Sequence, residues 1–148
     1  MNITKIYLDN CCYNRPYDDQ TQLRIELETK AKLHIQQQVV EKEILLVSSD
    51  ILEFENKDNP YLLRKSAIKS FLKNASEYVD MSEEIINSAR EINQKGIKIK
   101  DASHLACAIF AQCDYFLTTD DKLLKYKNDK IRILNPIDFI MIRGGSET

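Results

Sequence analysis

Short apolar, strand-like segments alternate with helix-like segments along the whole chain, and this alternation restricts the possible folds more than any other feature. The strand-like segments are residues 3–8, 44–47, 78–79, 114–118 and 131–134. Strands that alternate with helices form a parallel sheet with helices on both faces. We therefore expect an α/β fold with three layers, α/β/α, around a central parallel sheet of four to five strands in the order 3-2-1-4-5.

Apolar periodicity and capping residues predict the helices. The longest, from Asp19 to Lys42, has an apolar residue at every fourth position, namely Leu23, Leu27, Ala31, Ile35 and Val39. Ser, Asp and Pro favour the first positions of a helix. On these signals, further helices are expected from Ser49 or Asp50 to Glu55, from Pro60 to about Asn74, from Ser82 to near Gly96, over 101–113, and from Pro136 onward.

The composition is typical of one globular domain, with 148 residues that are 43% apolar and 30% charged. We assign residues 1–143 to this domain and residues 144–148 to a flexible tail. No apolar run is long enough to span a membrane, and the first residues lack a secretory pattern, so we expect a cytoplasmic protein without membrane contact. The net charge of −2 argues against a nucleic-acid coat, but it does not exclude a nuclease whose acids bind a metal.

The four cysteines, Cys11, Cys12, Cys107 and Cys113, contain no CxxC pair, and with only two histidines they lack the spacing of a structural zinc site. We interpret them as small buried thiols of a reducing compartment.

Two of the apolar segments are followed by acids. Ile6–Leu8 stops at Asp9, and Tyr115–Leu117 lies shortly before Asp120, while Asp101 opens the helix between them. Such acids can simply cap turns and helices. However, active sites of parallel sheets lie outside the carboxyl ends of the strands, where several carboxylates would repel one another unless a hard divalent cation binds them. The pattern therefore indicates a metal site and, through it, phosphate chemistry.

Other polar residues near these acids could contribute to the site. Glu53 and Glu55 are two positions apart, so on a helix they point in different directions and at most one faces the acids. His104 lies three residues after Asp101 and could lean toward a metal, although packing or local hydrogen bonding is the more common role. Thr118 could place a hydroxyl beside the carboxylates.

Four pieces of sequence resemble the PIN domain, the fold of many prokaryotic toxin ribonucleases of the VapC type. In the family's order they are YLDN at 7–10, an acid after Ser48 and Ser49, KDASHLACA at 100–108 and DYFLTTDDKLL at 114–124. The resemblance covers nearly the whole chain. It implies a three-layer fold and three or four acids that bind Mg²⁺ or Mn²⁺ and hydrolyse RNA.

Carried over residue by residue, the resemblance implies catalytic and metal-binding roles for four acids. These are Asp9, Glu55, Asp101 and Asp120. Glu55 is preferred over Glu53 because the family usually places this acid about six positions after the Ser or Thr that ends the second strand, here Ser49. The accessory candidates are Glu53, Thr118, Asp121 and Asn10.

The implied function is a Mg²⁺- or Mn²⁺-dependent endoribonuclease, which could be the toxin of a toxin–antitoxin pair. Its implied partners are RNA, an antitoxin protein and a second copy of the chain. The alternative is a catalytically inactive PIN-like module that binds RNA or protein. Two other classes fit poorly. A haloacid-dehalogenase site needs DxD, but Cys11 stands where the second Asp is required, and a response-regulator receiver needs paired acids after the first strand.

Overall fold

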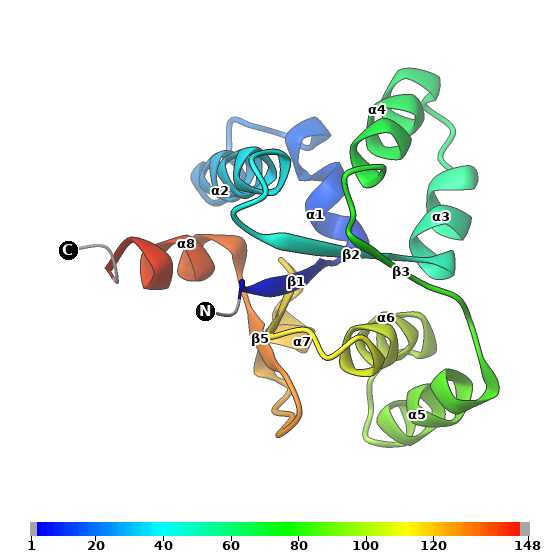
Figure 1. Cartoon of the computed structure of the whole chain (residues 1–148). Coiled ribbons are helices and arrows are strands. Elements are labelled where there is room, and N and C mark those ends of the chain that lie inside the picture. Colours follow the sequence, from blue (N-terminus) through cyan, green and yellow to red (C-terminus); the bar gives the residue numbers. More distant parts are fainter. Residues whose placement is uncertain (1–2, 146–148) are drawn as a thin grey trace.

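The computed structural model describes residues 3–145 and contains a five-stranded sheet in the order β3-β2-β1-β4-β5 (Figure 1). Every neighbouring pair of strands is parallel. The strands are β1 (Lys5–Leu8), β2 (Leu45–Ser49), β3 (Glu77–Val79), β4 (Tyr115–Leu117) and β5 (Arg132–Leu134). The predicted α/β class and the predicted strand order are both confirmed.

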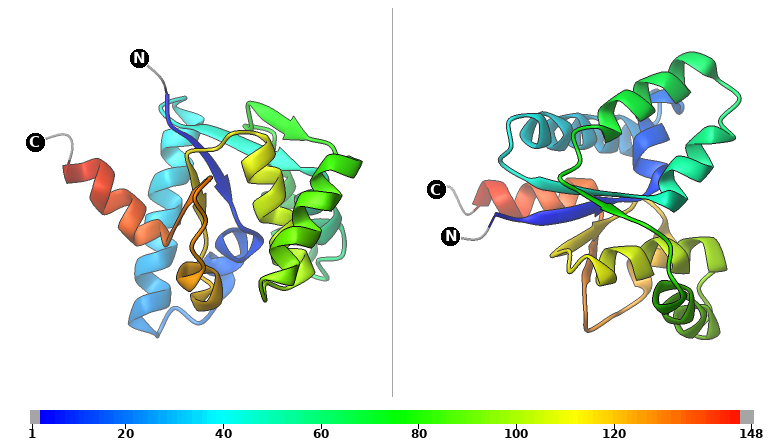
Figure 2. Two further views of the ribbon diagram at one scale, coloured as in Figure 1. Left: turned by 90° about the horizontal axis from the view of Figure 1, so that it is seen from below. Right: turned by 45° about the vertical axis from the view of Figure 1, so that its right-hand side comes forward.

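Helices cover both faces of the sheet. They are α1 (Asn10–Asn14), α2 (Leu23–Val40), α3 (Asp50–Lys57), α4 (Leu62–Leu72), α5 (Glu83–Gln94), α6 (Ile99–Phe110), α7 (Asp121–Lys125) and α8 (Pro136–Gly145), with the short 3₁₀ helix η1 (Arg15–Tyr17) after α1. In Figures 1 and 2, α1, α2 and α4 lie on one side of the sheet and α5 and α6 on the other, which confirms the three layers. None of the helices within residues 3–145 is long and apolar enough to cross a membrane.

Some helix boundaries differ from those predicted. The chain enters α1 and η1 directly after β1, and neither was predicted, because helices of five and three residues show no periodicity. Helix α4 begins at Leu62 rather than at Pro60, because Tyr61 has extended backbone angles. Helix α8 continues through Gly145, so the first two residues of the predicted tail are helical. Residues 146–148 of that tail lie outside the described part of the chain.

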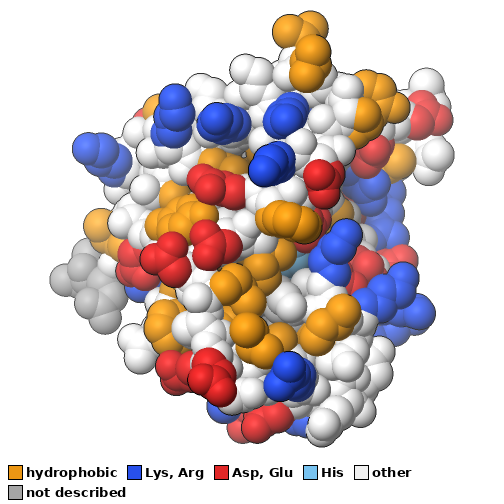
Figure 3. Space-filling view, turned by 90° about the vertical axis from the view of Figure 1, so that its right-hand side faces the viewer, with side chains coloured by type: hydrophobic (Ala, Val, Ile, Leu, Met, Phe, Trp, Pro, Cys, Tyr) orange, Lys and Arg blue, Asp and Glu red, His pale blue; other side chains and the backbone are white. Residues whose placement is uncertain are grey.

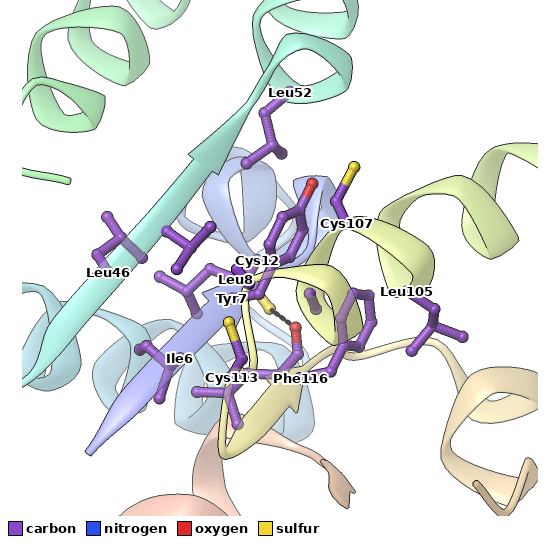
Figure 4. Close-up of a cluster of buried hydrophobic side chains, with 14 of the residues drawn as sticks. Ile6, Tyr7, Leu8, Cys12, Leu46, Leu52, Leu105, Cys107, Cys113 and Phe116 are labelled. Atoms are coloured by element: carbon purple, nitrogen blue, oxygen red, sulfur yellow. Dashed lines mark hydrogen bonds between the residues drawn. The ribbon is translucent and has the colours of Figure 1, made fainter. Parts of the chain in front are cut away.

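The central strand β1 is buried on both faces. Ile6, Tyr7 and Leu8 have no exposed surface and lie between Leu46 of β2 and Phe116 of β4 (Figure 4). The rings of Tyr7 and Phe116 stack with centroids 5.5 Å apart. Such continuous apolar runs are typical of central parallel strands, and each fully buried large side chain contributes about 1.5–3 kcal/mol to folding. This burial fixes the position of the residue that follows the strand.

A buried carboxylate joins α2 to the loops after β4 and β5. Glu28 is completely buried and accepts hydrogen bonds from Arg15 Nε at 2.8 Å, from Arg24 Nε at 3.1 Å and from the amide of Asn135. Arg24 also donates to both carboxylate oxygens of Asp121 and to the carbonyl of Thr119. A buried charge is tolerated only when it is paired in this way. We call these residues the Glu28 cluster.

Only the C-terminal half of the apolar stripe on α2 packs into the core. Ala31, Ile35 and Val39 are buried, whereas Leu23 is 70% exposed and Leu27 is 43% exposed. The exposed half lies beyond the part of the helix that covers the sheet. Periodicity predicts an apolar face but not where its neighbour ends.

A lysine buried in the α1, α2 and α4 layer yields a prediction about stability. Lys32 is 6% exposed, its Nζ donates to Gln36, and it lies over the rings of Tyr13 and Phe71. Burial lowers the pKa of Lys32 from 10.5 to about 8. Between these two pKa values the unfolded chain holds a proton that the folded chain lacks, so stability should rise with pH through this window.

We expect Lys32→Met to raise the free energy of unfolding at pH 7 by about 1–3 kcal/mol, because it removes the buried charge but keeps an apolar side chain. The gain should disappear above the pKa of the unfolded lysine. Urea denaturation at several pH values measures both effects. The control is Lys30→Met, an exposed position paired with Glu26, where a change within about 0.5 kcal/mol is expected. A loss of stability in Lys32→Met at pH 7 would contradict the prediction.

Candidate active site

The carboxyl ends of β1, β2 and β4 open into one acidic cavity of about 370 Å³. It is lined by Asp9, Asn10, Cys11, Asn14, Asp18, Glu55, Lys100, Asp101, His104 and Asp120. We call it the acidic pocket. All four acids that the resemblance singled out line this pocket, although they are as many as 111 positions apart in the chain. The arrangement places several carboxylates at the point where the strand order reverses, which is the usual ligand position in open parallel sheets.

Asp9 is held rigidly at the end of β1. It is 5% exposed, and its Oδ1 accepts the amide of Asn10 as the cap of α1. Its Oδ2 accepts the hydroxyl of Thr118 at 2.8 Å and the thiol of Cys11 at 3.4 Å. Burial, and to a lesser degree Cys11, raise the pKa of Asp9 well above its usual value. Ionising this carboxylate is therefore costly unless a positive charge comes near.

Asp120 and Asp101 stand at the starts of two helices. Asp120 caps α7, where its Oδ1 accepts the amides of Lys122 and Leu123 and its Oδ2 has no bond within residues 3–145. Asp101 lies in the first turn of α6. Burial and the charge of Asp120 raise the pKa of Asp101. The two carboxylates thus repel each other inside one cavity, and a divalent cation bound there would relieve this repulsion.

Glu55 is anchored by a chain of hydrogen bonds that enters the core. Its Oε1 bonds to Nε2 of His104, a side chain that is only 1% exposed. His104 Nδ1 bonds to the hydroxyl of Tyr7 at 2.6 Å, and this hydroxyl bonds to Ser49 Oγ at 2.7 Å. A neutral imidazole with its proton on Nε2 satisfies the whole chain, with Ser49 donating to Tyr7, Tyr7 to His104 and His104 to Glu55. Ser49 also caps α3, the helix that carries Glu55.

The accessory candidates separate into two groups. Asn10 lines the acidic pocket, and the hydroxyl of Thr118 supports it by bonding Asp9 and accepting the amide of Asp120. Glu53 lies elsewhere, where it accepts the hydroxyl of Tyr78 at 2.9 Å and lines the groove between α3 and α4. Asp121 belongs to the Glu28 cluster, and its pairing with Arg24 lowers the pKa of its carboxyl.

The donor set of the acidic pocket fits a hard divalent cation. Within residues 3–145, no three His, Cys, Asp or Glu side chains converge closely enough to hold a metal ion by themselves. Mg²⁺ does not require such a cluster, because it usually keeps several waters and binds through one or two carboxylates together with substrate phosphates. Burial raises the pKa values of Asp9 and Asp101, and a bound cation would favour the ionised form of both carboxyls.

Several pocket residues had no signal in the sequence analysis. Asn14 and Asp18 reach the pocket through the short helices after β1, which periodicity does not reveal. Lys100 is one of many lysines, and nothing in its neighbourhood distinguishes it. The partners of His104 could not be inferred, since Tyr7 is 97 positions away. Of the four thiols, all unpaired, Cys11 is the one that is only partly buried and lines the pocket.

Comparisons with known proteins identify the family and the fold. A model of the PIN domain family matches residues 6–129. One chain in the crystal structure of VapBC2 from Rickettsia felis, bound to a DNA fragment from their promoter, shares the fold with a TM-score of 0.57 and 16% identity, over 89% of this chain and 98% of that one. No curated protein sequence matches. Because the family match spans most of the chain, the protein belongs to the PIN domain family.

Proposed function

We propose that the protein is a cytoplasmic, metal-dependent endoribonuclease. The observation that carries the proposal is the convergence of Asp9, Glu55, Asp101 and Asp120 on one pocket. The two histidines do not serve a covalent mechanism: His104 is bonded to Glu55 and Tyr7, and His34 lies on α2, outside the acidic pocket. A pocket on which four carboxylates converge suits hydrolysis by a metal-activated water.

The residues of the acidic pocket would have different roles in metal binding and in RNA binding. Asp101 and Asp120, with the anchored Asp9 and Glu55, would hold one or two Mg²⁺ or Mn²⁺. When bound, the metal supplies an activated water and neutralises charge on the scissile phosphate. The hydrogen bond from Thr118 keeps the carboxylate of Asp9 in one orientation, as the bond from His104 does for Glu55. Lys100 adds a positive charge at the pocket, where it would attract the RNA backbone.

We further propose that the enzyme is the toxin of a toxin–antitoxin pair and forms a homodimer. The likeness to a chain of a VapBC2 complex supports this. So does the exposed apolar surface, which includes Leu23 and Leu27 of α2 and Phe54, Leu62 and Leu63 of α3 and α4. An antitoxin arginine could enter the acidic pocket, because it pairs with a carboxylate through two hydrogen bonds.

The groove between α3 and α4 is a second surface suited to a protein partner. It has a volume of about 550 Å³ and is lined by Phe54 and Leu72 together with Lys57, Lys65 and Lys69. Figure 3 shows basic side chains gathered over α4 on this face, next to apolar ones. Exposed apolar area with a charged rim is typical of protein interfaces.

The first test is metal binding. Mn²⁺ or Mg²⁺ should raise the thermal midpoint, because a metal concentration of a hundred times Kd adds about 2.7 kcal/mol to the free energy of unfolding. EDTA should abolish RNA cleavage. The metal response should strengthen as pH rises, because Asp9 and Asp101 have raised pKa values and must lose their protons before they bind a cation. Differential scanning fluorimetry across pH measures this. Cleavage that persists in EDTA would contradict a metal mechanism.

Asp101→Asn isolates one ligand in the same assay. It should weaken the metal response, and in EDTA it should raise the midpoint, because it removes a carboxylate whose ionisation is disfavoured by burial and by Asp120. The matched control is Asp129→Asn, an exposed position outside the pocket, which should change neither.

The second test separates the two middle acids. Glu55→Gln should lower the rate of cleavage by about 100-fold or more, because it removes a charged ligand, whereas the amide oxygen can still accept the bond from His104 and keep the fold. Glu53→Gln should have little effect, since Glu53 is exposed and bonds Tyr78 outside the pocket. Single-turnover cleavage and circular dichroism are the measurements. The opposite result would transfer the metal role to Glu53.

The third test concerns the partner. Expression of the chain alone should arrest growth of the host, and co-expression with the protein encoded by the adjacent gene should restore it. Asp120→Asn should not arrest growth. Light scattering should show a dimer. A protein that is monomeric, does not arrest growth and copurifies with no partner would contradict the toxin interpretation but not the nuclease chemistry. If metal-dependent cleavage were also absent, the protein would be an inactive binding module.

A further inference from the structure

A second, smaller cavity adjoins the acidic pocket. Its volume is about 220 Å³, and it is lined by Asn10, Asn14, Glu55, Asn56, Asp58, Asn59, Pro60, Tyr61 and Arg64. We call it the amide pocket. It shares Asn10, Asn14 and Glu55 with the acidic pocket, so the two lie side by side. Its lining combines four side-chain amides with two carboxylates, one proline, one aromatic ring and one guanidinium. Pockets for drug-sized ligands measure roughly 300–1,000 Å³, so this one suits a single planar ring.

The aromatic ring of the amide pocket is held in place but remains open. Tyr61 is 59% exposed, and the guanidinium of Arg64 packs over its ring at 4.2 Å from the centroid. Arg64 also packs over the ring of Tyr17 at 4.5 Å. The guanidinium therefore fixes one face of Tyr61 while much of the ring stays accessible. A pre-positioned aromatic face is the usual platform for an unstacked nucleobase.

The polar groups of the amide pocket have unused hydrogen-bonding capacity. Asn56 Oδ1 and Arg64 Nε are buried and have no hydrogen-bond partner within residues 3–145. Asn59 uses Oδ1 to accept the amide of Tyr61, and Asn14 uses Nδ2 to donate to Asn10, so each keeps the opposite end of its amide for a ligand. An amide offers a donor and an acceptor side by side, which matches the edge of a base. An unpaired buried polar atom costs free energy until a ligand satisfies it.

We propose that the amide pocket binds one unpaired nucleobase of the RNA whose phosphate lies in the acidic pocket. The proposal rests on the proposed ribonuclease function for the identity of the ligand. The base stacks on Tyr61 while the asparagine amides bond to its edge. A base inside a duplex cannot leave its stack without cost, so the site favours single-stranded substrate. It also gives the enzyme a contact that depends on a base and not only on the backbone.

The test measures binding without cleavage. Fluorescence anisotropy in EDTA compares a short labelled single-stranded RNA with the same oligomer in which all bases are replaced by abasic sites. The protein should bind the RNA more tightly by about 5- to 150-fold, the range for stacking of one base. Tyr61→Ala should lose this advantage and Tyr61→Phe should keep it. The control is Phe110→Ala, another partly exposed aromatic residue, which lies outside the amide pocket and should behave like the wild type.

The outcomes distinguish this proposal from the proposed function. Equal affinity for the RNA and the abasic oligomer, or an unchanged preference in Tyr61→Ala, overturns the base site even if metal-dependent cleavage is observed. A preference for RNA over the abasic oligomer that depends on Tyr61 supports the base site even if no metal produces cleavage. In that case only the proposed ribonuclease function is overturned. Equal binding of duplex and single-stranded RNA also overturns the proposal.

Discussion

The parallel pairing of β1 with β4 is the interaction on which the acidic pocket depends. Tyr7 lies opposite Phe116 and Leu8 opposite Leu117, so the two strands end at the same level. The chain then turns outward at Asp9 on one strand and at Thr118 on the other, and these two side chains bond to each other. Because β1 is buried on both faces, a shift of register would move the core together with the site. The position of the first acid is thus maintained by hydrophobic burial and not by the acid itself.

A second link between core and site runs through Tyr7. Its ring stacks on Phe116 in the core, and its hydroxyl lies between Ser49 and His104 on the way to Glu55. The hydrogen bonds that hold Glu55 therefore run from Ser49, the cap of α3, through Tyr7 to His104 of α6. Tyr7, which helps to position this carboxylate through His104, is thus part of the hydrophobic core. Changes to that part of the core are expected to reach the pocket, because packed interiors transmit displacement.

Much of the fold could be predicted from the sequence because its strong signals are local. The apolar runs at Ile6–Leu8 and Tyr115–Leu117 locate two central strands, and Ser49 and Ser82 cap helices as their side chains suggested. The proximity of Asp9 and Asp120 follows from the strand order, because each acid follows one of two neighbouring strands. The remaining features depend on contacts between distant residues. The burial of His104 against Tyr7 and the exposure of Leu23 and Leu27 on α2 are set by neighbours that no local pattern contains.

The cap formed by Asp120 has a consequence for reading relatives of this protein. The backbone amides of Lys122 and Leu123 both donate to the same oxygen, Oδ1, whereas Oδ2 makes no hydrogen bond within the described part of the chain. Asparagine caps helices as well as aspartate does. The exchange of one oxygen for a nitrogen would thus preserve the helix, the strand order and the shape of the cavity while removing a negative charge. Two proteins with superimposable backbones can therefore differ in whether they bind a cation, so a shared fold does not establish shared chemistry at the site.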